Sequence, residues 1–102
     1  MPGELRRQKR CIHRGKFRVS WEDSHGIPKF ATVRGCDISR SGIRVALPEA
    51  VSQNSLVVLQ SKLIKFAFSG RVRHCVRRGS DYLTGIEFSS PLAVDIETLP
   101  ES

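Results

Sequence analysis

The chain has 102 residues, of which 39% are hydrophobic and 26% are charged. These values are typical of a single globular domain and exclude a disordered or collagen-like chain. No apolar run approaches the roughly 18 residues of a membrane span, and the first residues lack the apolar stretch of a secretory signal. We therefore expect a cytoplasmic protein without a membrane span. The three cysteines, Cys11, Cys36 and Cys75, show no paired spacing, which favours reduced thiols.

The formal net charge of +7 is concentrated at the N-terminus. Residues 1–18 contain seven basic side chains and only Glu4 as an acid, whereas residues 79–102 contain five acids and no base. Such an asymmetry indicates an anionic partner, and nucleic acid, an anionic membrane surface and a small phosphorylated ligand all fit. A solvated basic tail that only aids solubility remains the alternative.

Strands are predicted wherever apolar and polar residues alternate with a period of two. The predicted strands comprise residues 17–22, 29–38, 43–47, 56–59, 64–77 and 82–88. In the fifth strand the apolar face is expected to carry Ile64, Phe66, Phe68, Gly70, Val72, His74 and Val76. Because that strand is long, we expect it to bend, with Gly70 as the bending point.

Six strands joined by short turns, without helical periodicity between them, predict an all-β fold. A small domain buries such strands most easily in a six-stranded antiparallel β-barrel, which also removes exposed sheet edges. Ser90 as N-cap and Pro91 as first helical residue predict one short C-terminal helix. Residues 1–16 are expected to form a flexible basic arm, and residues 17–102 the barrel with its helix.

Catalytic and metal-binding chemistry have little support in the sequence. The histidines His13, His25 and His74 are expected in the arm, in a turn and on the apolar face of a strand, so none is placed as a base beside a nucleophile. The carboxylates are scattered, and no acid and base pair is evident. The residues of His74-Cys75 should point to opposite faces of a strand, and Cys11 with His13 matches no known zinc spacing. We expect no enzyme activity, no metal and no cofactor.

A binding site for a nucleotide is better supported. Arg6 and Arg10 lie four residues apart in the arm, and arginine can bind phosphate, read the O6/N7 edge of guanine and stack on a base. A carboxylate such as that of Asp37 can accept hydrogen bonds from N1 and N2 of guanine, which would select this base. Ser39 offers a small donor, and Gly42 allows either a positive φ or close approach of a ligand. The same three residues also suit an ordinary turn.

The combination of two motifs resembles the PilZ domain family. The first is R-x-x-x-R before the first strand, here Arg6 to Arg10, and the second is D-x-S-x-x-G, here Asp37 to Gly42. The segment Thr84 to Phe88 (TGIEF) is similar to the last strand of that family. The resemblance covers about residues 5–99. It implies a six-stranded antiparallel barrel with a C-terminal helix and a receptor for the bacterial second messenger cyclic di-GMP.

The resemblance also implies roles for individual residues. Arg6 and Arg10 would bind phosphate and guanine, with Arg7 as a further candidate. On the barrel, the surface that contacts the ligand would be lined by Asp37, Ser39 and Gly42. Arg10 and Arg14 have the same spacing as Arg6 and Arg10. In that alternative register Arg14 would enter the site and Arg6 would leave it.

The expected function is that of a sensor or adaptor in which ligand binding orders the arm and changes the surface seen by an unidentified partner protein. One alternative is a small basic barrel that binds single-stranded nucleic acid. It is disfavoured because few aromatic residues remain to stack bases once Phe17, Trp21, Phe66 and Phe68 occupy the apolar face of their strands. Another alternative is a PilZ-like module that has lost the dinucleotide and only binds proteins.

Overall fold

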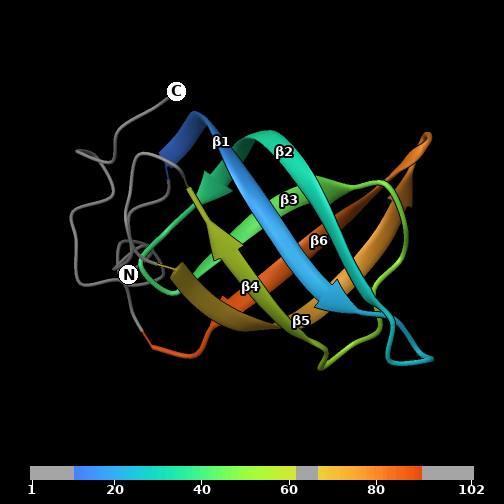
Figure 1. Ribbon diagram of the computed structural model, residues 1–102. Coiled ribbons are helices and arrows are strands. Elements are labelled where there is room, and N and C mark those ends of the chain that lie inside the picture. Colours follow the sequence, from blue (N-terminus) through green and yellow to red (C-terminus); the bar gives the residue numbers. More distant parts are fainter. Residues whose placement is uncertain (1–10, 62–66, 91–102) are drawn as a thin grey trace, which may run out of the picture.

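The computed structural model describes residues 11–61 and 67–90, which form six strands and no helix (Figure 1). Their bounds are β1 Cys11–Glu22, β2 Pro28–Ile38, β3 Gly42–Leu47, β4 Leu56–Gln60, β5 Ala67–Arg78 and β6 Asp81–Phe88. No helix in this part of the chain could cross a membrane. The predicted C-terminal helix, from Pro91 onward, lies outside the described residues.

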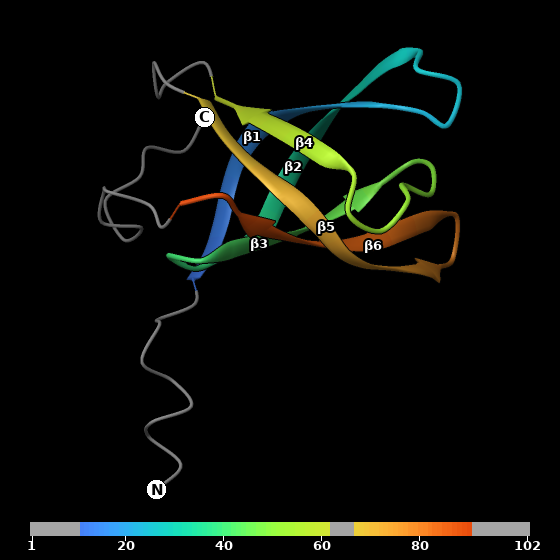
Figure 2. The same cartoon turned by 90° about the horizontal axis from the view of Figure 1, so that it is seen from below.

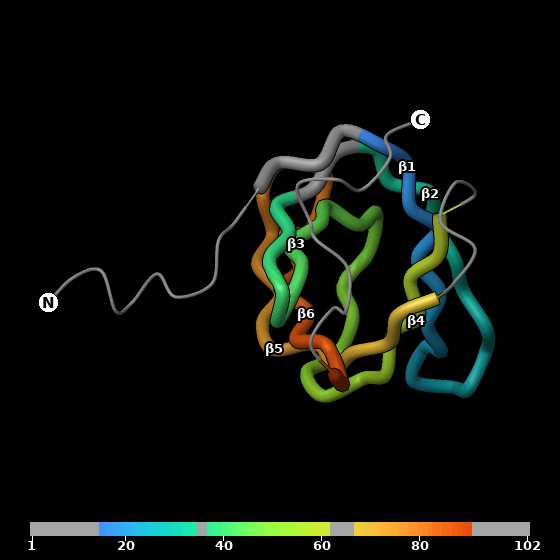
Figure 3. Tube along the Cα trace, turned by 90° about the vertical axis from the view of Figure 1, so that its left-hand side faces the viewer, coloured from blue at the N-terminus to red at the C-terminus, as the bar shows by residue number. Residues whose placement is uncertain are grey.

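The strands close into a barrel in the order β1-β2-β3-β6-β5-β4, with every pair antiparallel. The predicted all-β antiparallel barrel is thus confirmed. Two of the strand pairings are short: β1 pairs with β4 only over Arg18–Ser20, and β2 pairs with β3 only at Asp37 and Ile38. These short pairings separate the long β1–β2 hairpin from β3, β6, β5 and β4. In the view of Figure 3, β1, β2 and β4 lie on the right and β3, β5 and β6 on the left.

The first strand begins earlier than the sequence predicted. It starts at Cys11 and not at Phe17, because residues 11–13 pair with the end of β2: Cys11 with Ile38 and Ile12 with Asp37. A register irregularity between His13 and Lys16 then leads into the alternating part of the strand. Residues 11–16, which the sequence assigned to the flexible arm, consequently belong to the barrel.

The barrel interior is filled by the inward-facing residues of all six strands. In β1 these are Phe17, Val19 and Trp21, all buried, as the alternation predicted. The ring of Phe68 packs between those of Phe17 and Phe88, with centroids 6.0 and 5.5 Å apart. Burial of one such side chain contributes about 1.5 to 3 kcal/mol, so this cluster stabilises the closed barrel. Phe66 lies outside the described residues.

The alternation predicted for β5 fails after Val72. The register of β5 against β6 shifts between Val72 and His74, so that Val72 is fully buried while His74 is exposed and Val76 is 57% exposed. A β-bulge adds one residue to a strand and turns the following side chains to the other face. The prediction that His74 and Val76 belong to the apolar face is therefore wrong.

Gly70 is not the site of this irregularity. It pairs regularly with Val57 and with Phe88, and a Cβ atom there would collide with the carbonyl oxygen of Glu87. Glycine at this position allows β5 and β6 to approach closely, which is the other role of glycine within a strand.

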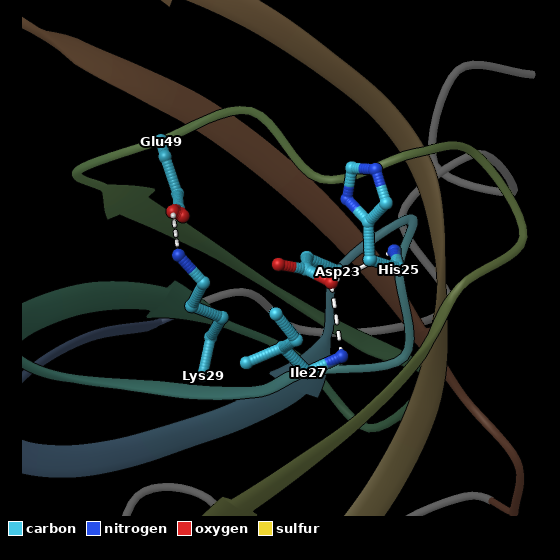
Figure 4. Close-up of polar contacts among 5 residues, drawn as sticks. All are labelled: Asp23, His25, Ile27, Lys29 and Glu49. Atoms are coloured by element: carbon cyan, nitrogen blue, oxygen red, sulfur yellow. Dashed lines mark hydrogen bonds and ion pairs between the residues drawn. The ribbon is translucent and has the colours of Figure 1, made fainter.

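The turn between β1 and β2 is held by the carboxylate of Asp23, which accepts hydrogen bonds from the backbone N–H groups of His25 (2.8 Å) and Ile27 (2.9 Å) (Figure 4). The bond from Ile27 is the main cause that lowers the pKa of Asp23 below its ordinary value of 3.8. Beside the turn, Lys29 Nζ lies 3.4 Å from Glu49 and links β2 to the loop after β3. His25 thus lies in a turn, as predicted, and its backbone N–H helps to hold that turn.

Candidate nucleotide-binding site

The segment Asp37 to Gly42 connects β2 with β3 at the end of the barrel where β1 begins (Figure 2). Asp37 lies opposite Ile12 of β1 and opposite Arg44 of β3. Its neighbour Ile38 is fully buried, so by strand alternation Asp37 points to the outer face, where it is partly exposed. The carboxylate is thus located where a ligand could reach it.

Ser39 is buried, with only 2% of its surface exposed, and its polar groups hold the turn. Its backbone N–H donates to the carbonyl oxygen of Gly42 (2.8 Å), and its hydroxyl donates to the same oxygen (3.4 Å). The hydroxyl also accepts from the N–H of Ser41 (3.4 Å). Of the two roles considered for Ser39 in the sequence, the structure displays the turn-stabilising one.

Gly42 has a negative φ. The described glycines with a positive φ are Gly26 and Gly79. A Cβ atom on Gly42 would lie 2.5 Å from the carbonyl oxygen of Ile86, which is backbone and cannot move aside easily. Next to it, Phe88 N–H donates to the carbonyl oxygen of Ser41 (2.8 Å). Glycine is therefore required here because β3 approaches β6 closely, which is one of the two explanations considered from the sequence.

A shallow cleft of about 330 Å³ opens on the outer face beside this turn. It brings together residues from the turn, β3, β5 and β6, and its polar lining consists of Ser39, Ser41, Arg44, Arg73, His74 and Glu87. Arg73 forms an ion pair with Glu87, in which its Nε lies 2.5 Å from the carboxylate oxygen. Arg44 and His74 add basic groups to a cleft that contains only this one carboxylate among its lining residues.

The imidazole of His74 lies over the backbone of Gly85. A Cβ atom on Gly85 would collide with Cε1 of the ring and would lie 2.6 Å from Nε2. The ring is therefore on the outer face, and Cys75, which packs against the core, faces the other way. Among the described residues no three His, Cys, Asp or Glu side chains are arranged to hold a metal ion.

Sequence reasoning missed the contributions of Arg44, Arg73 and His74 to this cleft. Arg44 could have been found, because it lies on the outer phase of the strand that follows the motif. The position of His74 depends on the bulge in β5, and no residue type in that segment predicts a bulge. β3 meets the β5–β6 hairpin, which is distant from it in the sequence, at this cleft.

The arginines Arg6, Arg7 and Arg10 lie outside the described residues. Arg10 is bonded to Cys11, however, and Cys11 pairs with Ile38, the residue next to Ser39. The arm is therefore attached to the barrel directly beside the Asp37 to Gly42 segment. The backbone of Arg14 lies in β1. The alternative register, in which Arg14 replaces Arg6 in the motif, stays a prediction.

The fold places the chain in the class of small antiparallel β-barrels, with a cleft rich in basic side chains beside the connection of β2 to β3. Comparison with known families gives the more specific assignment. Residues 4–100 match the PilZ domain, so the chain belongs to the PilZ domain family. No curated protein and no solved structure matches the chain significantly.

Proposed function

We propose that this PilZ domain is a cytoplasmic receptor for cyclic di-GMP, which binds in the cleft beside the Asp37 to Gly42 turn. The observation that carries the proposal is the pairing of Cys11 with Ile38, because it attaches the arginine-rich arm next to the motif that the family resemblance assigns to the ligand. The two motifs, although 27 residues apart from Arg10 to Asp37, can thus act on one molecule.

Each part of the ligand has a suitable group in this arrangement. Arg6 and Arg10 would bind the phosphates and stack on a guanine, with Arg7 as a further contact. The Asp37 carboxylate would accept from N1 and N2 of guanine. Arg44, at the position opposite Asp37, would add positive charge for a phosphate. Ser39 and Gly42 would shape the turn against which the ligand rests.

The energetics favour a moderate affinity. Ordering the five residues Arg6 to Arg10 costs on the order of 5 to 10 kcal/mol of backbone entropy, and each charge-assisted hydrogen bond returns roughly 1.5 to 3 kcal/mol. Several such bonds are needed before binding becomes favourable. We therefore expect a dissociation constant near the micromolar range, about −8 kcal/mol, that weakens as salt screens the arm.

The domain would act without catalysis. A cationic arm that becomes ordered over a rigid barrel presents a changed surface to a partner protein, and the ligand needs no other effect to transmit a signal. Single-stranded nucleic acid is a weaker candidate, because Phe17, Trp21, Phe68 and Phe88 are buried and Phe30 alone among the described phenylalanines is largely exposed, whereas such binders stack successive bases on several aromatic rings.

Calorimetry with cyclic di-GMP tests the proposal, with cyclic di-AMP as the control ligand. Arg10→Ala and Asp37→Ala should each reduce the affinity at least tenfold, about 1.4 kcal/mol. Arg78→Ala, an exposed arginine at the far end of β5, is the matched control and should bind as the unchanged chain does. Equal heats for the two dinucleotides, or no loss with Arg10→Ala, would contradict the assignment.

A further inference from the structure

The outer face of β4, β1 and β2 carries a second surface that the proposed ligand site does not use. These three strands lie side by side toward the viewer in Figure 1, and their outward residues form rows across the sheet. Going from one end of the face to the other, the rows are Gln60, Arg18 and Thr32, then Val58, Ser20 and Phe30. Beyond the paired part of β1 and β4, the groove on this face is lined by Leu56, Glu22 and Pro28.

This face is apolar and hollow at its centre. Ser20 is small and lies between Val58 and Phe30, and a groove of about 1010 Å³ opens there. Phe30 is 56% exposed and Leu56 is 48% exposed, which places two of the largest exposed hydrophobic side chains of the described residues at one groove. An exposed cluster of this kind, with polar residues around it, is typical of a protein interaction surface.

The charges of the groove are arranged with opposite signs at its two ends. Arg18 lies over the ring of Phe30, 4.1 Å from its centroid, and has no carboxylate partner among the described residues. Glu22 follows four residues later on the same strand and likewise has no ion pair in this part of the chain. The other charges nearby are already used, since Lys29 pairs with Glu49 and Asp23 holds its turn.

We propose that this face binds a second copy of the same chain, with the two β1 strands antiparallel across a two-fold axis at Ser20. Strands of face-to-face sheets pack about 10 Å apart, close enough for their side chains to meet. If the two-fold axis lies between the two sheets, parallel to them and perpendicular to the strands, Arg18 of one copy faces Glu22 of the other, and Phe30 faces Phe30. An axis along the strands would place Arg18 against Arg18, which repels.

The dimer is weak and independent of the proposed ligand. Nine outward residues are fewer than the roughly 20 to 30 residues per partner of a standard stable interface, so association is reversible and concentration-dependent. The groove is lined by residues beside the β1–β2 turn, and the cleft by residues of the connection between β2 and β3. Figure 2 shows that this turn and this connection lie at opposite ends of β1. A ligand in the cleft therefore leaves the groove accessible.

Sedimentation equilibrium of the full chain without ligand tests the proposal through a charge exchange. Arg18→Glu alone and Glu22→Arg alone each create like-charge contacts across the axis and should raise the dimer dissociation constant at least about tenfold. The double variant R18E/E22R restores opposite charges and should return to within about threefold of the unchanged chain. Arg78→Glu, outside the groove, is the control for the change in net charge.

Thermal unfolding of each variant shows whether the barrel is retained. If a charge-reversed chain fails to fold, Arg18→Gln and Glu22→Gln replace it, and each should weaken the dimer by a smaller factor of about three. A chain that remains monomeric up to millimolar concentration overturns the proposal. A dimer that ignores the single reversals, or one that the double reversal does not restore, overturns it as well and assigns the groove to a different protein.

Discussion

The imidazole of His74 occupies the space that a side chain at position 85 would fill, so Gly85 and His74 form one unit at the floor of the cleft. The bulge in β5 turns His74 outward, and the missing Cβ of Gly85 lets the ring lie against β6. The ring of His74 could not take this position if residue 85 carried a side chain. This places an imidazole within the basic cleft beside the Asp37 to Gly42 turn.

A methyl group at position 85 should displace the ring of His74 and little else. Because the colliding atoms belong to a side chain that can rotate, we expect Gly85→Ala to change the free energy of unfolding by about 1 kcal/mol or less. Its effect on cyclic di-GMP affinity should equal that of His74→Ala, and the double variant should show no further loss. Calorimetry of the three variants measures this, and additive losses would show that the two residues act separately.

Gly42 should tolerate substitution much less well than Gly85. A Cβ atom at position 42 meets the backbone oxygen of Ile86, so β3 and β6 would have to separate. We expect Gly42→Ala to lower the free energy of unfolding by about 2 kcal/mol. Urea denaturation provides the measurement. Gly79→Ala, where nothing lies within 4 Å but φ is +63°, should cost only about 1 kcal/mol. An equal or larger loss for Gly79→Ala would contradict the steric explanation.

Asp23 should make the β1–β2 turn sensitive to acid. Its pKa is lowered in the folded protein, chiefly by the Ile27 N–H, so its contribution is fully present above the ordinary value of 3.8 and is lost as the pH falls through the lower folded value. Carboxyl titration followed by NMR should therefore give Asp23 a pKa below 3.8. In Asp23→Asn the melting temperature should depend less on pH in that acidic range. An unchanged pH profile would rule out this role of the carboxylate.

The barrel could be predicted because its inward residues alternate regularly. Phe17, Val19 and Trp21 in β1 follow a strict period of two, and the structure buries all three. The start of β1 at Cys11 could not be predicted, since residues 11–13 are ordered by pairing with Ile38 and its neighbours and not by an apolar pattern of their own. Pairing between distant segments is invisible to local periodicity.

The candidate site shows the same limit. Asp37, Ser39 and Gly42 stand out in the sequence because they are close together, although the structure uses Ser39 and Gly42 to build the turn. Arg73 points outward by ordinary alternation, whereas His74 reaches the cleft only because one extra residue in β5 reverses the side-chain order after Val72. A bulge depends on the register of two strands, so no alternation within β5 alone could reveal it.

The location of the ligand is the central claim, and mapping of backbone amide shifts during a titration with cyclic di-GMP tests it most directly. The account predicts that the largest shifts occur at Asp37 to Arg44, at His74 and at Gly85, whereas Phe30 and Leu56 in the distant groove remain unchanged. The same titration with Arg10→Ala should show the shifts only at much higher ligand concentration. Shifts confined to the β4, β1 and β2 face, or none at saturating ligand and low salt, would contradict the account.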